Sequence, residues 1–151
     1  METFLAEHGL PALFVLSFFS ATLIPLGSEW LLAVLLLKGS DPLAVVTVAT
    51  LGNTLGALAT YAIGLWGGPY LIHRVLRIDE EARRRAVSFY ARFGSWSLLL
   101  SWLPVVGDPL CLAGGVLRVG TRRFLMLVAL GKLARYAVVA GMVLEGGRWM
   151  G

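Results

Sequence analysis

The chain has 151 residues, of which 58% are hydrophobic and 15% charged, and its mean hydropathy is +0.79. Soluble domains usually carry about 25% charged residues, so this composition excludes an ordinary soluble protein and indicates an integral membrane protein. The net charge is +4, and the single cysteine, Cys111, excludes an intramolecular disulfide and is expected to pack as a small apolar residue. We predict one all-α membrane domain covering 1–151.

The first apolar run, 10–37, is interrupted by Pro25, Gly27 and Glu29. A continuous membrane-spanning helix is not expected to hold a proline and a carboxylate near its middle, because the charge is costly and the proline frees a backbone carbonyl. Ser28 is a candidate N-cap for a short helix that begins at Glu29. The run is therefore predicted to be a re-entrant hairpin that is followed by a turn at 38–42.

The next run, 43–66, is unbroken and long enough to cross the roughly 20-residue span of a hydrocarbon core. Gly52 and Gly56 form a small-xxx-small pattern, which predicts close helix packing. Asn53 lies beside Gly52, and we expect it to offer hydrogen bonds at the site.

A different kind of helix is predicted within the connector at 70–94. Asp79 is a candidate N-cap, Gly94 suits the position after the last turn, and two i,i+4 pairs join Glu80 to Arg84 and Glu81 to Arg85. Its apolar residues share one face: Ala82, Ala86, Phe89, Tyr90 and Phe93. Such a basic amphipathic helix is predicted to lie at the lipid headgroups, and its arginine cluster is too short to favour a nucleic-acid partner.

The second apolar run, 98–117, is broken by Pro104, Gly107, Asp108 and Pro109. Asp108 followed by a proline suits an N-cap with proline at the first helical position, and a buried acid at a polar site is the other interpretation. A shift of 79 residues places Pro25 on Pro104, Glu29 on Asp108 and Gly52 on Gly131. Matching breaks in the two halves predict an inverted repeat, with repeat 1 at about 10–66 and repeat 2 at about 96–145.

The distribution of basic residues predicts the topology. The stretches 70–95 and 118–123 hold nine of the thirteen lysines and arginines, so both are expected on the cytoplasmic side. The run 98–117 must then re-enter on that side, while 43–66 and 124–144 cross the membrane completely. Irregular backbone at membrane depth must be covered by protein or line a cavity, so the two breaks should meet near the midplane of a multi-pass protein.

The last run carries Lys132, Arg135 and Tyr136 near its middle. Ionisable residues inside a membrane are functional candidates and usually pair with opposite charges. Lys132 and Arg135 would form a four-charge cluster with Glu29 and Asp108. Such a cluster could carry protons or bind a phosphate group. Two alternatives stay open: the charges only hold the hairpins in place, or Lys132 snorkels to the membrane surface.

The sequence holds no Ser-His-Asp set, glycine-rich phosphate loop or metal-ligand spacing, so we expect no enzyme activity, no cofactor and no metal. His8 and His73 are expected at the surface. The five tryptophans are expected to be interfacial anchors; they are Trp30, Trp66, Trp96, Trp102 and Trp149.

The segments Leu-Ile-Pro-Leu-Gly-Ser-Glu at 23–29 and Trp-Leu-Pro-Val-Val-Gly-Asp-Pro at 102–109, followed by Ala-Gly-Gly at 113–115, resemble the DedA superfamily (VTT or SNARE-associated domain), in its small YqaA-like branch. The resemblance implies two re-entrant hairpins, a bacterial inner (plasma) membrane location, relatedness to lipid scramblases and polyprenyl-phosphate flippases, and a required acid at Glu29. The family's second hairpin has arginines three residues to either side of its proline, where this chain has Ser101 and Gly107. Arg135 or Lys132 is the candidate replacement.

These observations predict a membrane transporter that moves a lipid or amphiphile, such as a polyprenyl phosphate or phospholipid, between leaflets. Membrane lipids are the expected partners, while proton coupling and a homo-oligomer are left open. The alternatives are a non-transporting scaffold or assembly factor, and a transporter of a small solute or ion.

Overall fold

The computed structural model describes residues 2–20, 27–67, 80–102 and 107–151, and all regular elements in these ranges are helical. The helices are, in chain order, α1 (Glu2–Ser20), α2 (Gly27–Leu37), α3 (Pro42–Trp66), α5 (Glu80–Phe93), the 3₁₀ helix η1 (Gly94–Trp102), α6 (Gly107–Val116) and α7 (Thr121–Met150). The predicted all-α class is confirmed.

Two helices, α3 and α7, are the ones among the described residues that are long and apolar enough to cross a membrane. They have 25 and 30 residues, and at about 1.5 Å per residue both exceed a hydrocarbon core of roughly 30 Å. They agree with the predicted runs 43–66 and 124–144. The rings of Tyr61, late in α3, and Phe124, early in α7, lie 4.4 Å apart, so the two helices are antiparallel.

Helices α1 and α2 pack against each other as an antiparallel hairpin. Gly9 lies against Leu35 at the open end, and the hydroxyl oxygens of Ser20 and Ser28 are 3.1 Å apart at the closed end. The helix α1 begins at Glu2, before the predicted run, and continues through Pro11.

The predicted start of the next helix at Glu29 is wrong by two residues, because α2 begins at Gly27. Ser28 therefore lies inside the first turn and does not act as the N-cap. Its hydroxyl is held by side chains of other helices. The predicted turn at 38–42 is confirmed: Gly39 has a φ of +88°, and Asp41 caps α3 by accepting a 3.1 Å hydrogen bond from the Ala44 amide.

The elements η1 and α6 form the second hairpin. The backbone of Ser101 lies directly against Gly107, where a side chain would collide with it, and a Cβ at Gly114 would lie 3.5 Å from Leu98. Helix α6 begins at Gly107, one residue before the predicted cap at Asp108. The first arm is a nine-residue 3₁₀ helix, which is longer than such helices usually run and was not expected from the sequence.

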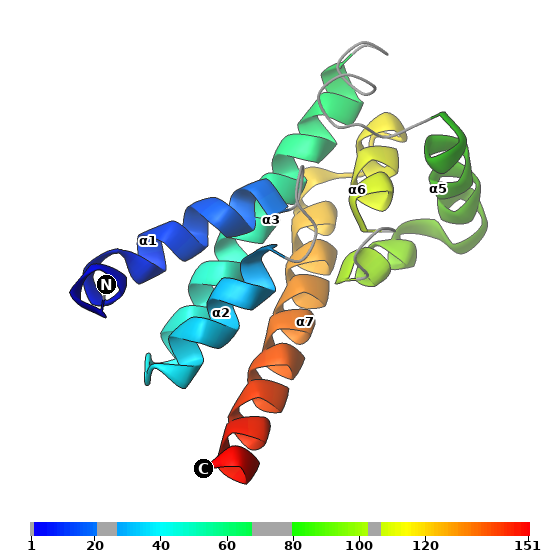
Figure 1. Ribbon diagram of the computed structural model, residues 1–151. Coiled ribbons are helices and arrows are strands. Elements are labelled where there is room, and N and C mark those ends of the chain that lie inside the picture. Colours follow the sequence, from blue (N-terminus) through cyan, green and yellow to red (C-terminus); the bar gives the residue numbers. More distant parts are fainter. Residues whose placement is uncertain (1, 21–26, 68–79, 103–106) are drawn as a thin grey trace.

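The long helix α7 separates the two hairpins: α1 and α2 lie on one side of it and η1, α6 and α5 on the other (Figure 1). The first arm of each hairpin packs on a different long helix, α1 on α3 and η1 on α7. The second arms cross over, so that α2 contacts α7 and α6 contacts α3.

Glycines allow the close contacts between these elements. A Cβ at Gly52 would meet the Phe14 carbonyl and Ser17 of α1, and one at Gly131 would lie 2.9 Å from the Leu99 carbonyl of η1. Close packing predicted at Gly52 is therefore confirmed.

The connector helix α5 matches its predicted bounds, and Gly94 after it has a φ of +70°. The Glu80–Arg84 pair forms at 3.6 Å, and Glu81 pairs with Arg85. The apolar face of α5 is covered by protein, because buried Ala86 packs with Leu110 and Ala113 of α6. At the edge of this face Phe93 is 51% exposed.

Candidate functional site

The described acid at a hairpin break, Glu29, forms an ion pair with Arg135. Glu29 lies in the first turn of α2 and Arg135 in the middle of α7, and their side chains are only 15% and 12% exposed. The Arg135 guanidinium also lies 5.8 Å from the centre of the Tyr136 ring. The second oxygen of Glu29, Oε2, has no hydrogen-bond partner among the described residues.

A chain of hydrogen bonds runs beside this ion pair through four helices. The hydroxyls of Tyr136 and Ser28 are 2.8 Å apart, and Ser28 is 3.1 Å from Ser20. The Asn53 amide donates to the Ser20 hydroxyl at 2.8 Å and to the Ser17 carbonyl at 3.0 Å. We call Asn53, Ser20, Ser28 and Tyr136 the polar chain. It joins the closed end of the first hairpin to the middle of α3 and of α7.

Several buried oxygens of the two hairpins and of α3 have no hydrogen-bond partner among the described residues. They are the side-chain oxygens of Ser17, Thr50, Thr54 and Ser101, together with Asn53 Oδ1 and Glu29 Oε2. Buried polar groups in folded proteins nearly always have partners, and exceptions indicate water, an ion or a ligand. Their concentration near the middle of α3 indicates a polar site rather than a purely apolar core.

Lys132 is buried, with 2% of its surface exposed, in the stripe of α7 residues that also includes Val128 and Tyr136. It therefore does not snorkel to the surface, because it is near the middle of a 30-residue helix and is covered on all sides. It forms no ion pair with an acid of the described residues. Gly131 beside it faces η1, where a Cβ would lie 3.2 Å from the Ser101 hydroxyl.

The structure brings together Glu29, Arg135, Tyr136 and Asn53 from the predicted site, with Lys132 one turn away on α7. Pro25 and Pro104 lie outside the described residues, as does the side chain of Asp108. Of the predicted four-charge cluster, the structure therefore describes Glu29, Arg135 and Lys132. Gly27 and Gly107 are the first residues of α2 and α6, and Pro109 follows in the first turn of α6.

Sequence reasoning missed the roles of Ser17 and Ser20 and treated Ser28 only as a cap. A signal was available, because these hydroxyls flank a break in an otherwise apolar run. The hydrogen bond from the Tyr61 hydroxyl to the Val119 carbonyl, which ties α3 to the turn before α7, was also missed and has no evident sequence signal.

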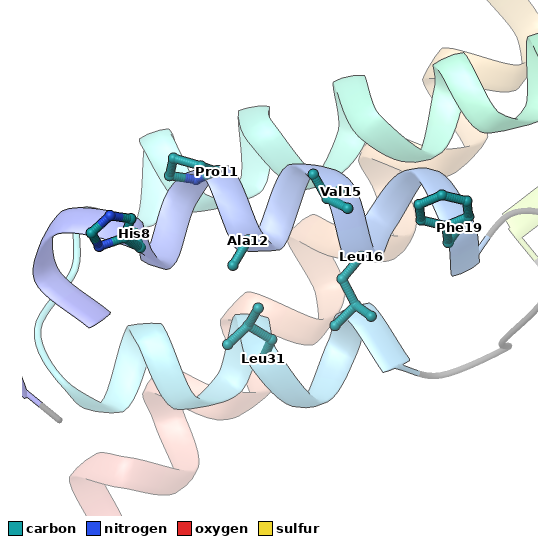
Figure 2. Close-up of a pocket in the computed structure, with 7 residues that line it drawn as sticks. All are labelled: His8, Pro11, Ala12, Val15, Leu16, Phe19 and Leu31. Atoms are coloured by element: carbon teal, nitrogen blue, oxygen red, sulfur yellow. The ribbon is translucent and has the colours of Figure 1, made fainter. Parts of the chain in front are cut away.

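An apolar groove lies on the outer face of the first hairpin (Figure 2). Its volume is about 620 Å³. It follows one side of α1 from His8 to Phe19, with Leu31 of α2 on its other wall. Phe19 precedes Ser20 in the chain and Leu31 lies two residues after Glu29, so the inner end of the groove is next to the polar chain.

Two membrane-length helices flanked by short helical hairpins, with charged and polar side chains buried between them, define a helical integral membrane protein with an internal polar site. The model of the VTT domain matches residues 24–144. The chain therefore belongs to the VTT-domain, or DedA, family of membrane proteins, and the resemblance seen in the sequence is confirmed.

Similar proteins support this assignment. The chain is 40% identical over 139 residues to Inner membrane protein YqaA of Escherichia coli (strain K12), covering 91% of this chain and 93% of that protein. The values are the same for Inner membrane protein YqaA of Shigella flexneri. An uncharacterized protein of Haemophilus influenzae is 37% identical over 146 residues, which is 90% of this chain and 88% of that protein. No solved structure matches the chain.

Proposed function

We propose that this protein is a transporter of the DedA type that moves a lipid or other amphiphile, such as a phospholipid or a polyprenyl phosphate, between the leaflets of a bacterial inner membrane. The observation that carries the proposal is the ion pair of Glu29 and Arg135, which is buried beside the polar chain and unpartnered oxygens. Ionisable groups at this depth are expensive and are typically retained for transport or proton relay.

Helix lengths support re-entrant hairpins. The helices α2 and α6 have 11 and 10 residues, or roughly 15 Å each, which is about half of a hydrocarbon core. The start of α2 is bonded to Tyr136, and Ser101 at the end of η1 lies near Gly131, so both hairpins close near the middle of α7. The crossed packing of the second arms on α7 and α3 supports an inverted repeat.

Protonation of Glu29 supplies a means of coupling. The neutral acid would lose most of its attraction for Arg135, so the contact between α2 and α7 would weaken and the first hairpin would be released. A proton bound from one side and lost to the other would then alternate the access of the site.

The apolar groove suits the hydrocarbon chain of an amphiphile. Its α1 wall runs for eleven residues beyond His8, or roughly 16 Å, which is about the thickness of one leaflet's hydrocarbon. The groove starts beside the polar chain, so a headgroup at the site could keep its chain in lipid.

An orientation with the start of α7 in the cytoplasm is supported by the exposed Arg122 and Arg123 in its first turn and by Arg118 in the turn before it. The basic stretches 70–95 and 118–123 would then be cytoplasmic. The name of the similar YqaA proteins, inner membrane protein, supports the membrane proposed.

The test is leaflet exchange of labelled lipid in vesicles that contain the Glu29→Gln variant. We expect the exchange rate to fall at least about tenfold, a loss of about 1.4 kcal/mol of transition-state stabilisation. Glu145→Gln is the matched control, since that acid is 68% exposed. Asp108→Asn tests the acid of the second hairpin in the same assay. Wild-type rates in folded Glu29→Gln and Asp108→Asn protein would refute the proposal.

The ion pair itself favours a second candidate, a non-transporting scaffold in which Glu29 and Arg135 only lock α2 onto α7. In that case the single variants of the pair would lose stability and cellular activity. The double variant Glu29→Gln/Arg135→Gln, whose amides can hydrogen-bond to each other, would recover both relative to the single variants. In a proton-coupled transporter it would restore stability but not transport.

A further inference from the structure

We propose that Lys132, together with the hydroxyl of Ser101, binds the phosphate group of an anionic ligand between η1 and α7. This inference rests on the proposed function and deepens it, since it names the group of the amphiphile that the site recognises and the residues that contact it. It assigns different roles to Lys132 and Arg135, the two basic residues near the middle of α7.

Lys132 is buried in α7 without a described counter-charge. The side chain is 2% exposed and forms no ion pair with a described acid. An ammonium group at membrane depth without a negative partner is strongly unfavourable, because neither water nor a counter-charge offsets its desolvation. An anionic ligand would remove this cost when it binds.

Arg135 is the other cation on the same face of α7. Its guanidinium is paired with Glu29, so the net charge of that pair is zero. Lys132 is therefore the buried cation of α7 whose charge is not already compensated by a described residue.

A second hydrogen-bond donor, the Ser101 hydroxyl, lies beside the turn of α7 that holds Lys132. The Ser101 hydroxyl is completely buried and has no hydrogen-bond partner among the described residues. It faces Gly131, where a Cβ would be 3.2 Å from the hydroxyl oxygen, and Gly131 precedes Lys132 in the chain. The absence of a side chain at this position brings η1 against α7 and places the serine beside the lysine's own turn.

The chemistry of these groups suits phosphate. A lysine ammonium has three donors and acts as a point charge on phosphate oxygens, and a serine hydroxyl adds a fourth donor. The same chemistry would accept a lipid phosphate headgroup or inorganic phosphate, so the experiment includes both.

The experiment measures binding to the full-length protein in detergent micelles, with dihexanoyl phosphatidate as the probe. For Lys132→Gln we expect an affinity at least about tenfold lower, and for Ser101→Ala about threefold to tenfold lower, as for the loss of one hydrogen bond. Lys132→Arg should keep most of the affinity. Lys38→Gln is the matched control, because Lys38 is the chain's other lysine and is exposed. Equal affinity in folded wild-type and Lys132→Gln protein would overturn the proposal.

A second measurement needs no variant at the site. With two lysines in the chain, amine-reactive labelling followed by peptide mass spectrometry reports each separately. Phosphatidate should protect Lys132 and leave Lys38 unchanged, whereas dihexanoyl phosphatidylcholine, which has no net charge, should protect Lys132 less. A Lys132 reactivity that rises in Asp108→Asn and ignores phosphatidate would show an internal partner and overturn the proposal.

The source of the phosphate is decided by competition. Inorganic phosphate that protects Lys132 as well as phosphatidate does would identify a free-phosphate site, and protection by phosphatidate alone would identify a headgroup site. Either result supports binding at Lys132. Protection without leaflet exchange would leave this inference standing while the transport proposal fails. If the Lys132→Gln variant binds phosphatidate and exchanges lipid at wild-type levels, this inference fails while the transport proposal stands.

Discussion

Glu29 and Arg135 are separated by more than a hundred residues in the chain, yet they form the main charge contact of the site. Each is nearly buried, so each needs the other to offset the loss of water. The bond between Ser28 and Tyr136, which are the neighbours of Glu29 and Arg135 in the chain, holds the same two helices together at the same level.

The first prediction concerns this pair. Arg135→Gln leaves the Glu29 carboxylate buried without its cation and should lower the free energy of unfolding by about 3–5 kcal/mol, whereas Glu29→Gln/Arg135→Gln should recover most of that loss. Thermal unfolding of the detergent-solubilised protein measures both. A double variant as unstable as the single one would show that charge pairing does not determine the stability of this contact.

The control for this comparison is Arg148→Gln, which removes an arginine whose side chain is 79% exposed and whose partner Glu145 is 3.6 Å away. An exposed pair of this kind contributes about 1 kcal/mol or less, so the variant should melt close to the wild type.

At the scale of elements, the hairpins are held against the long helices by glycines. Gly52 of α3 contacts α1, and Gly131 of α7 contacts η1. These two glycines occupy matching positions in the two halves of the chain. Backbones that approach this closely gain dispersion contacts, which are the main source of helix association in lipid.

The second prediction is that Gly52→Val separates α1 from α3. A Cβ at this position would overlap the Phe14 carbonyl, and relieving that overlap should cost at least about 1–3 kcal/mol. The fraction of monodisperse protein in size-exclusion chromatography, with thermal unfolding, measures the effect.

Gly141→Ala is its control, because nothing lies within 4 Å of a Cβ at that exposed position of α7. Alanine favours a helix over glycine by about 1 kcal/mol, so this variant should be as stable as the wild type or more so. Equal behaviour of the two variants would contradict the role given to Gly52.

At the scale of the whole molecule, the antiparallel arrangement of α3 and α7 places the turn before α3 and the turn before α7 at opposite ends. Tyr61 meets Phe124 at one end, and Gly147 lies near Leu37 at the other. If both helices cross the membrane, residues in these two turns must face opposite compartments.

The third prediction follows from this geometry. In a Cys111→Ala background, Ser40→Cys should react with a membrane-impermeant maleimide from the periplasmic side and Gly120→Cys only from the cytoplasmic side. Cys111 itself is completely buried, so its replacement removes background without changing the surface. Labelling of both positions from one side would contradict the two crossings.

The sequence alone determined that this is a helical membrane protein, where its long helices and their turns lie, and that acids stand at two breaks. Hydropathy, capping and charge distribution act over a few turns of the chain, so the sequence itself predicts these features. The helices α3 and α5 and the turn at 38–42 were found where they were predicted. The start of α2 was misplaced because Ser28 bonds to Ser20 and Tyr136 instead of capping its own helix.

Only the tertiary structure decided which base pairs with Glu29, that Lys132 is buried without a described acid, and that α6 covers the apolar face of α5. Each of these results depends on contacts between segments far apart in the chain. Their geometry arises from how helices pack, and neither spacing nor hydropathy records it.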